Sequence, residues 1–262
     1  MLNVILRYRG FILGMVNREV RGRYSGSVFG SAWAILNPLA MIAVYTLVFS
    51  QVMQARLPDI DDSLAYGIFL CTGIFAWTLF AETLTRTVTI FVDNANLIKK
   101  SNFPRIVLPL IVSLTSLVNY AIIMGLFGLF LVITGRMPGW SVLAFIPLLA
   151  IQIMFAAGLG IFLGVLNVFF RDVQQVTSIV VQFWFWLTPI VYPVVILPEY
   201  AVSLLTTFNP MAEIMLAYQD IVLRGEWPVW SLFLDQALLA GASVVIGWWS
   251  FRKLVWEMVD EL

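Results

Sequence analysis

The chain has 262 residues, of which 61% are hydrophobic and 11% are charged, and its formal net charge is zero. A mean hydropathy of +0.94 lies outside the range of soluble globular domains. One cysteine excludes an intrachain disulfide framework, and the absence of histidine removes the commonest general base and transition-metal ligand. The composition therefore predicts an integral membrane protein with about five to seven spans of roughly 20 residues each.

The first segment, residues 1–31, is predicted to be an amphipathic helix lying on the membrane surface. Its apolar face carries Ile5, Ile12, Val16 and Val20, and its basic face carries Arg7, Arg18 and Arg21. The alternative is a plain positively charged flank that only fixes the topology. The arginines interrupt any apolar core, so the segment does not resemble a cleaved signal peptide.

Six membrane spans are predicted, all in one transmembrane domain that covers residues 1–262 of this all-α chain. They are Ala32–Met53, Leu64–Leu84, Ile106–Thr134, Trp140–Phe170, Thr177–Leu197 and Ser231–Phe251. The third and fourth are long enough to tilt in the bilayer.

The loop charges orient these spans. Twelve of the fifteen Lys and Arg residues lie before span 1, between spans 2 and 3, between spans 4 and 5, or after span 6. Only Arg56, Arg136 and Arg224 lie in the opposite loops, which also carry seven acidic residues. Because positive loops stay in the cytoplasm, both termini are predicted to be cytoplasmic and the number of spans even.

Two connecting segments are too apolar to be free linkers. Residues 91–104 read FVDNANLIKKSNFP and predict a short cytoplasmic amphipathic helix that ends at Pro104. Residues 198–230 predict short helices that dip back into the membrane from outside, where irregular backbone must be covered by protein or line water.

Polar residues inside the second span recur at helical spacing: Thr78, Glu82, Thr85 and Thr89. An acid at membrane depth usually faces a bundle interior or water, so Glu82 is the sharpest functional candidate. The alternative is that the span ends just before Glu82 and leaves it at the membrane surface.

Two spans carry aromatic and polar stripes that could line a path for a sugar polymer. The tentative path residues are Trp33, Asn37, Met41, Tyr45, Phe49, Thr78, Glu82, Gln182 and Trp186. Aromatic rings at span ends are more often anchors at the membrane surface, and the run FWFW at 183–186 places rings on every side of its helix. Ala156, Gly160 and Gly164 in span 4, with Gly241 and Gly247 in span 6, predict close helix packing.

The sequence has no phosphate-binding Gly-rich loop, no metal-ligand cluster and no nucleophile–base pair. No catalytic or metal site is therefore predicted, and intramembrane charges are fewer than in most ion-coupled transporters. The chain is predicted to be a conduit and not an enzyme. A membrane acyl- or glycosyltransferase is the less favoured alternative.

Several colinear blocks resemble the permease subunits of type-2 ATP-binding-cassette exporters that move finished polysaccharides. The blocks are RGRYSGSVFGSAWAILNPLAMIAVYTLVFSQV at 21–52, NANLIKKSNFPRIVLPL at 94–110, FFRDV at 169–173, LTPIVYP at 187–193, FNPMAEI at 208–214, LRGEWP at 223–228 and WEMVDEL at the end. Together they cover nearly the whole chain.

The resemblance implies a homodimer of six-span permeases with two copies of a separate ATPase, which binds ATP and Mg in place of this chain. It implies export of lipid-linked O-antigen-type polysaccharide across the bacterial inner membrane. Teichoic acid, capsule, and drug or lipid export remain as alternatives. Spans 1, 2 and 5 would line the channel between the two permease copies, capped by the external segment. The helix that couples to the ATPase would comprise Asp93, Asn94, Asn96, Leu97, Ile98, Lys99, Lys100, Asn102 and Phe103.

Overall fold

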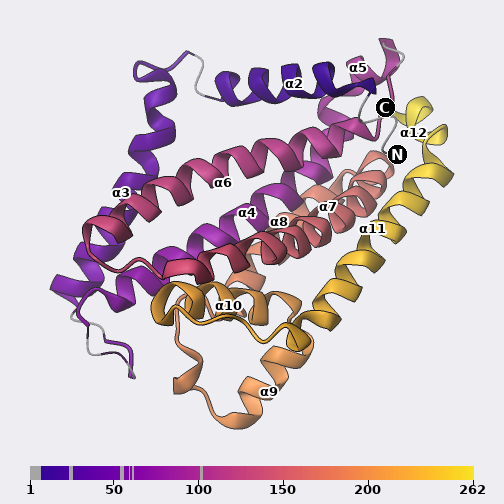
Figure 1. Cartoon of the computed structure of the whole chain (residues 1–262). Helices are drawn as coiled ribbons and strands as arrows, with labels where there is room; N and C mark the ends of the chain where they lie inside the picture. Colours follow the sequence, from indigo (N-terminus) through magenta and orange to yellow (C-terminus); the bar gives the residue numbers. More distant parts are fainter. Residues whose placement is uncertain (1–6, 24–25, 54–55, 59, 61, 101–102) are drawn as a thin grey trace.

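A computed structural model of the chain describes residues 7–23, 26–53, 56–58, 60, 62–100 and 103–262. These residues form helices joined by short loops (Figure 1). The helices are α2 (Arg9–Gly22), α3 (Trp33–Leu47), α4 (Ala65–Asp93), α5 (Ala95–Lys100), α6 (Val107–Ile133), α7 (Phe145–Phe169), α8 (Asp172–Trp186), α9 (Glu199–Phe208), α10 (Pro210–Arg224), α11 (Leu234–Leu254) and α12 (Glu257–Glu261). The predicted all-α class is confirmed.

Five helical stretches in the described part of the chain are long and apolar enough to cross a membrane. They are Gly30–Ser50, Ala65–Asp93, Val107–Ile133, Gly139–Phe169 and Trp230–Leu254. Each begins within a few residues of a predicted span, because the apolar runs that set the hydropathy also set the helix. The second continues from the predicted end at Leu84 to Asp93.

The fifth predicted span is not a continuous helix. α8 has 15 residues, about 22 Å at 1.5 Å per residue, and it ends at Trp186 instead of continuing to Leu197. Pro189 and Pro193 explain the early end, because proline has no N–H to donate and disfavours helical backbone at the residue before it. The segment after α8 runs through turns to a short 3-10 turn at Val194–Ile196.

Side chains from the next helical layer bind the carbonyls that this break exposes. The amide of Asn209, at the start of α10, donates to the Leu187 carbonyl at 3.1 Å. The amide of Gln219 within α10 donates to the Pro189 carbonyl at 3.1 Å. A buried carbonyl without a donor is costly, so these two amides allow the chain to leave the helix inside an apolar setting.

α4 is the central helix of the bundle. It is 78% buried over its most apolar window, against 33% or less for the other four span-length stretches. It packs against α3, α6, α7, α8 and α10. Figure 1 shows α2, α5 and α12 gathered at one end of the bundle and α9 and α10 at the other. Every other long helix is therefore positioned by its contact with α4 or with a neighbour of α4.

Small residues set the closest packing, as predicted for span 4. A Cβ atom on Gly160 would lie 2.6 Å from the Cβ of Thr87 in α4, and one on Gly164 would lie 2.8 Å from the Thr87 carbonyl oxygen. Gly247 brings α11 equally close to α7, since its Cβ would lie 2.4 Å from the carbonyl oxygen of Gly158. The backbones of α4, α7 and α11 are therefore in direct contact.

One predicted packing position is wrong. Gly241 in α11 meets nothing within 4 Å at the place where a Cβ would stand. Its position in the sequence resembles that of Gly247, but it lies on a face of α11 that has no neighbouring helix within reach.

Within the N-terminal segment, residues Arg9–Gly22 form α2. Ile12 and Val16 are buried, whereas Arg18 and Arg21 are exposed. The helix lies across the end of the bundle above α6 (Figure 1). Ile5, which was assigned to the apolar face, lies outside the described residues.

Candidate functional site

The polar stripe of α4 forms one continuous, partly open face of this otherwise buried helix. Thr78, Glu82, Thr85 and Thr89 are all of intermediate exposure. The Thr78 and Thr85 hydroxyls each donate at 2.7 Å to a carbonyl four residues earlier in the helix. The donor of each hydroxyl is therefore satisfied within α4.

Glu82 lies well inside α4, which continues past it to Asp93. Its side chain is 15% exposed. One carboxylate oxygen accepts from Arg23 in the segment after α2 and from Arg86 at 3.4 Å. The other accepts from the Asn119 amide of α6 at 3.0 Å. The Glu82 carboxylate thus joins two arginine side chains and one amide.

The same cluster fastens α2 to α4. Arg86 donates to Glu19 of α2 at 2.6 Å while it also donates to Glu82. Two acids and two arginines thus alternate along one line, from α2 through α4. A cavity of about 300 Å³ adjoins this line and includes Arg23 and Asn119 in its lining. The charged network therefore closes one wall of a cavity between α2, α3 and α6.

The stripe predicted on α3 divides into two halves. Trp33 and Asn37 are exposed, and Trp33 keeps 40% of its surface. Met41, Tyr45 and Phe49 are partly buried against the bundle. The C-terminal part of the stripe, from Met41 onward, therefore packs against neighbouring helices. The N-terminal part, Trp33 and Asn37, faces outward from this single chain.

The two residues predicted on α8, Gln182 and Trp186, are exposed, and Trp186 keeps 60% of its surface. Their neighbours Trp184 and Phe185 instead face the core, with ring centroids 6.1 and 6.0 Å from Trp77 of α4. Sequence reasoning did not single out this inner aromatic cluster. The run of four aromatic residues signalled an aromatic helix but did not indicate which rings face α4.

The predicted channel residues therefore lie on α3, on the π-helical turn Val48–Val52 that follows it and holds Phe49, on α4 and on α8. α4 contacts both α3 and α8. The outermost of the predicted residues, on α3 and α8, lie on open surfaces of the single chain.

The segment predicted to couple to an ATPase contains α5, a helix of six residues. Ile98 is 2% exposed and lies in an apolar cluster with residues of α6, α7 and α12. Leu97 packs against the same cluster, whereas Lys99 and Lys100 are exposed. The short helix thus fixes its apolar side in the bundle and presents two cations to its surroundings.

Of the remaining predicted coupling residues, Asn96 lies within α5 and the others flank it. Asp93 and Asn96 are exposed. Asn94 donates from its amide to a backbone carbonyl of α4 at 2.9 Å, which ends that helix. Phe103 packs on an aromatic ring of α2, with 5.4 Å between centroids. Asn102 lies outside the described residues.

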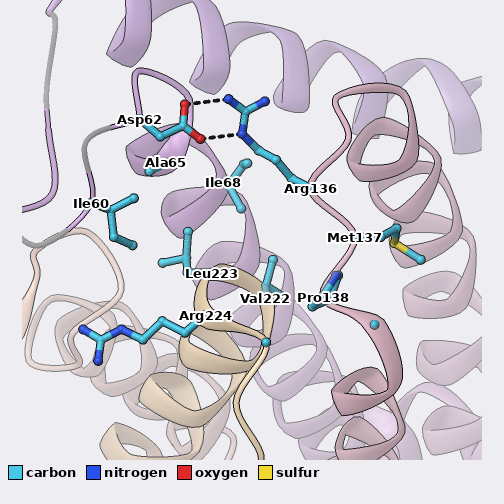
Figure 2. Close-up of a pocket in the computed structure, with 12 residues that line it drawn as sticks. Ile60, Asp62, Ala65, Ile68, Arg136, Met137, Pro138, Val222, Leu223 and Arg224 are labelled. Carbon is cyan, nitrogen blue, oxygen red and sulfur yellow. Dashed lines mark hydrogen bonds and ion pairs between the residues drawn. The ribbon is translucent and has the colours of Figure 1, made fainter.

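A pocket of about 420 Å³ lies at the other end of the bundle, where none of the predicted site residues is found (Figure 2). Arg136 donates from Nε and Nη2 to the two carboxylate oxygens of Asp62, the second at 2.6 Å. This hydrogen bonding by Arg136 holds the pKa of the Asp62 carboxyl below its usual value. Arg224 of α10 and the backbone of Pro138 complete the rim. The ion pair ties the loop before α4 to the loop after α6.

A family model described as "ABC-2 type transporter" matches residues 11–223 of the chain. The chain belongs to the ABC-2 type transporter family. The match runs from α2 into the last turn of α10, so it includes the polar stripe of α4, the charged network and α5. This family membership places the chain among membrane transport proteins.

Several named proteins are similar to this chain over most of its length. An O-antigen export system permease protein RfbA of Klebsiella pneumoniae is 35% identical over 80% of this chain and 79% of its own length. The protein of the same name from Myxococcus xanthus is 33% identical over 93% of this chain and 91% of its own. A polysialic acid transport protein KpsM of Escherichia coli is 23% identical over 79% of each.

Proposed function

We propose that this chain is the permease subunit of an exporter that moves lipid-linked O-antigen-type polysaccharide. The observation that carries the proposal is the 33–35% identity, over most of both chains, to proteins named as O-antigen export permeases. The lower identity of 23% to a polysialic acid transport protein makes capsule export the second candidate. The aromatic faces of α3 and α8 support a carbohydrate path, because a ring face packs well on the C–H face of a sugar.

The proposed setting is the bacterial inner membrane, with both termini in the cytoplasm and six spans. In this proposal α8 and the turns after it form the fifth span, and α9 and α10 form the external re-entrant segment. α2 lies in the interface of the cytoplasmic leaflet. The basic loops at the end where α2, α5 and α12 gather support this orientation.

The proposed channel lies between two copies of the chain. Its walls are the open faces of α3, α4 and α8 from each copy. Support comes from Trp33 and Trp186, which remain 40% and 60% exposed in the single chain. Large exposed aromatic rings on two helices that both contact α4 are typical of a surface that a partner covers or a ligand contacts. In this arrangement the Thr hydroxyls and Glu82 on α4 are the polar part of the channel lining.

The proposed energy source is ATP with Mg, bound by a separate ATPase that docks at α5. Lys99 and Lys100 are the exposed cations of α5, and Ile98 anchors the helix in the bundle. A push on α5 would reach α4 directly, since only Asn94 separates the two helices in the sequence. This connection supports α5 as the point at which ATPase closure moves the lining of the channel.

The deciding experiment is co-purification of the tagged chain with the products of neighbouring genes, followed by an ATPase assay. The proposal expects a stoichiometric ATPase whose rate rises when lipid-linked O-antigen is added. Stimulation by capsular polysaccharide alone would select the second candidate. A chain that purifies with no nucleotide-binding partner would contradict both.

A further inference from the structure

An apolar groove of about 450 Å³ opens between α6, α7 and α11, where neither the channel residues nor the coupling residues lie. Its walls include Ile106, Leu110, Ile153, Met154, Ala157 and Trp248. The volume is that of a site for a small ligand, which falls in the range of about 300–1,000 Å³. The lining is almost wholly apolar, which suits a hydrocarbon chain and does not suit a sugar.

The groove exists because its three helices diverge unevenly. α7 and α11 touch backbone to backbone at Gly158 and Gly247, and both helices are long and apolar enough to cross a membrane. α6 shares far less contact with α7, so a gap remains between its first two turns and the α7–α11 pair. The gap runs from the middle of α7 toward the end of the bundle that holds α5 and α12.

Two cations mark that end of the groove. Arg105 lies in sequence between the lining residues Pro104 and Ile106, and its guanidinium lies 5.4 Å from the Trp256 ring. Arg252 lies 5.9 Å from the ring of Trp248, which itself lines the groove. An arginine on an indole ring at the end of a span is typical of the membrane–water interface.

Arg105 and the end of α11 are joined directly. One guanidinium nitrogen of Arg105 donates to the Val255 carbonyl, just beyond α11, at 3.4 Å. A guanidinium has five N–H donors in a planar fork that matches phosphate oxygens. The groove therefore combines a hydrocarbon-sized slot with phosphate-binding chemistry at the level where headgroups lie.

We propose that this groove binds one anionic glycerophospholipid from the leaflet at the α5–α12 end. One acyl chain lies between α6 and the α7–α11 pair, and the phosphate is held by Arg105 and Arg252. The site is separate from the α3, α4 and α8 faces, so it does not depend on what the protein transports.

The test is native mass spectrometry of the full-length purified chain, with an equimolar mixture of phosphatidylglycerol and phosphatidylcholine of identical acyl chains. We expect one phosphatidylglycerol to be retained at least five-fold over phosphatidylcholine. In the double variant R105Q/R252Q the ratio of retained phosphatidylglycerol to retained phosphatidylcholine should fall at least three-fold. Ala157→Phe, which fills the slot, should reduce retention of both lipids.

The matched control is Lys253→Gln. Lys253 adjoins Arg252 in the last turn of α11 and lies over Trp249, which is not part of the groove lining. This control removes a charge from the same helix end and should leave the preference unchanged. Equal loss in the control and the double variant would overturn the proposal, as would equal retention of the two lipids by the unmodified chain.

Two further outcomes are decisive. Displacement of phosphatidylglycerol by an equal concentration of a polyprenyl phosphate would assign the groove to a carrier lipid and overturn the proposal. If Ala157→Phe does not elute as folded protein in size exclusion, the two charge variants still decide the result, because their altered side chains reach the surface.

Discussion

Glu82 joins three helical segments at one carboxylate, through Arg23, Arg86 and the Asn119 amide. Glu82→Gln removes the charge and leaves both arginines without this acceptor. Because the site is only partly exposed, we expect a loss of about 2 kcal/mol in the free energy of unfolding. Thermal unfolding in detergent would measure the loss as a lower Tm.

The control for Glu82→Gln is Glu226→Gln, an exposed acid in the loop before α11. It should change the Tm little, since exposed charges contribute about 1 kcal/mol or less. Equal Tm values for the two variants would show that the cluster does not hold α2 to α4.

The Asp62–Arg136 pair predicts an acid-dependent contribution to stability. The pKa of Asp62 is lowered in the folded protein, so folding is favoured most where the unfolded carboxyl is already ionised. At neutral pH the free energy of unfolding of the unmodified chain should be about 1 kcal/mol larger than that of Asp62→Asn, which is the usual contribution of a partly exposed ion pair. The difference should shrink as the pH falls from about 4 through the lower folded value.

Unfolding curves of both proteins between neutral pH and about pH 3 would measure this difference. Arg136→Gln removes the cause of the pKa shift and should show the same pH dependence as Asp62→Asn. A difference that stays constant down to the lowest pH would refute the assigned role of the pair.

At the scale of an element, α5 is the helix whose exposed charge can be reversed without disturbing its packing. Lys99→Glu with Lys100→Glu leaves the buried Ile98 in place, so membrane insertion should be normal. On the proposed coupling role, export of surface polysaccharide should fall at least ten-fold. Lys253→Glu, at the same end of the bundle, is the control for charge alone. Normal export from the double variant would end the assignment of α5.

Glycines of α7 and α6 give a matched pair of substitutions. Gly160→Ala places a methyl group 2.6 Å from Thr87, which forces α4 and α7 apart and should destabilise the fold by about 1–3 kcal/mol. Gly125→Ala in α6 meets nothing within 4 Å and should be neutral or stabilising by up to about 1 kcal/mol. Chemical or thermal unfolding of both variants compares them directly, and similar losses would contradict the packing account.

At the scale of the whole molecule, the open faces of α3 and α8 predict where two copies meet. In a Cys71→Ser background, a cysteine at Asn37 or Gln182 should form a disulfide between two copies in native membranes. A cysteine at Val245, exposed on the outer face of α11, should not. Gel electrophoresis without reductant measures the dimer band, and cross-linking from Val245 alone would reverse the proposed arrangement.

Hydropathy was sufficient to predict where five long helices begin, because each crossing needs an unbroken apolar run. It overestimated the length of α8, because an apolar run can also contain a break in the helix. Pro189 and Pro193 signalled that break, and the amides of Asn209 and Gln219 stabilise it from far along the chain. Such rescue by distant side chains leaves no local pattern in the sequence.

The site was predicted in part for a related reason. Helical spacing placed Thr78, Glu82 and Thr85 on one face of α4, and they share it. The pairing of Glu82 with Arg23 joins residues 59 positions apart, and no periodicity encodes such a contact. The rotation of α8 was equally hidden, because four consecutive aromatic residues present the same chemistry in every direction.

The glycine contacts of α4, α7 and α11 have a mechanical consequence. Helices whose backbones touch cannot slide without separating, because no flexible side chains lie between them to absorb the shear. These three helices should therefore move together as one rigid body. α3 also approaches α4 closely, since a Cβ on Gly67 would lie 3.0 Å from the Cα of Thr46. α8 instead meets α4 through long aromatic side chains, Trp184 and Phe185 against Trp77, so it can tilt. Any opening wide enough for a polymer would then begin between α8 and α4.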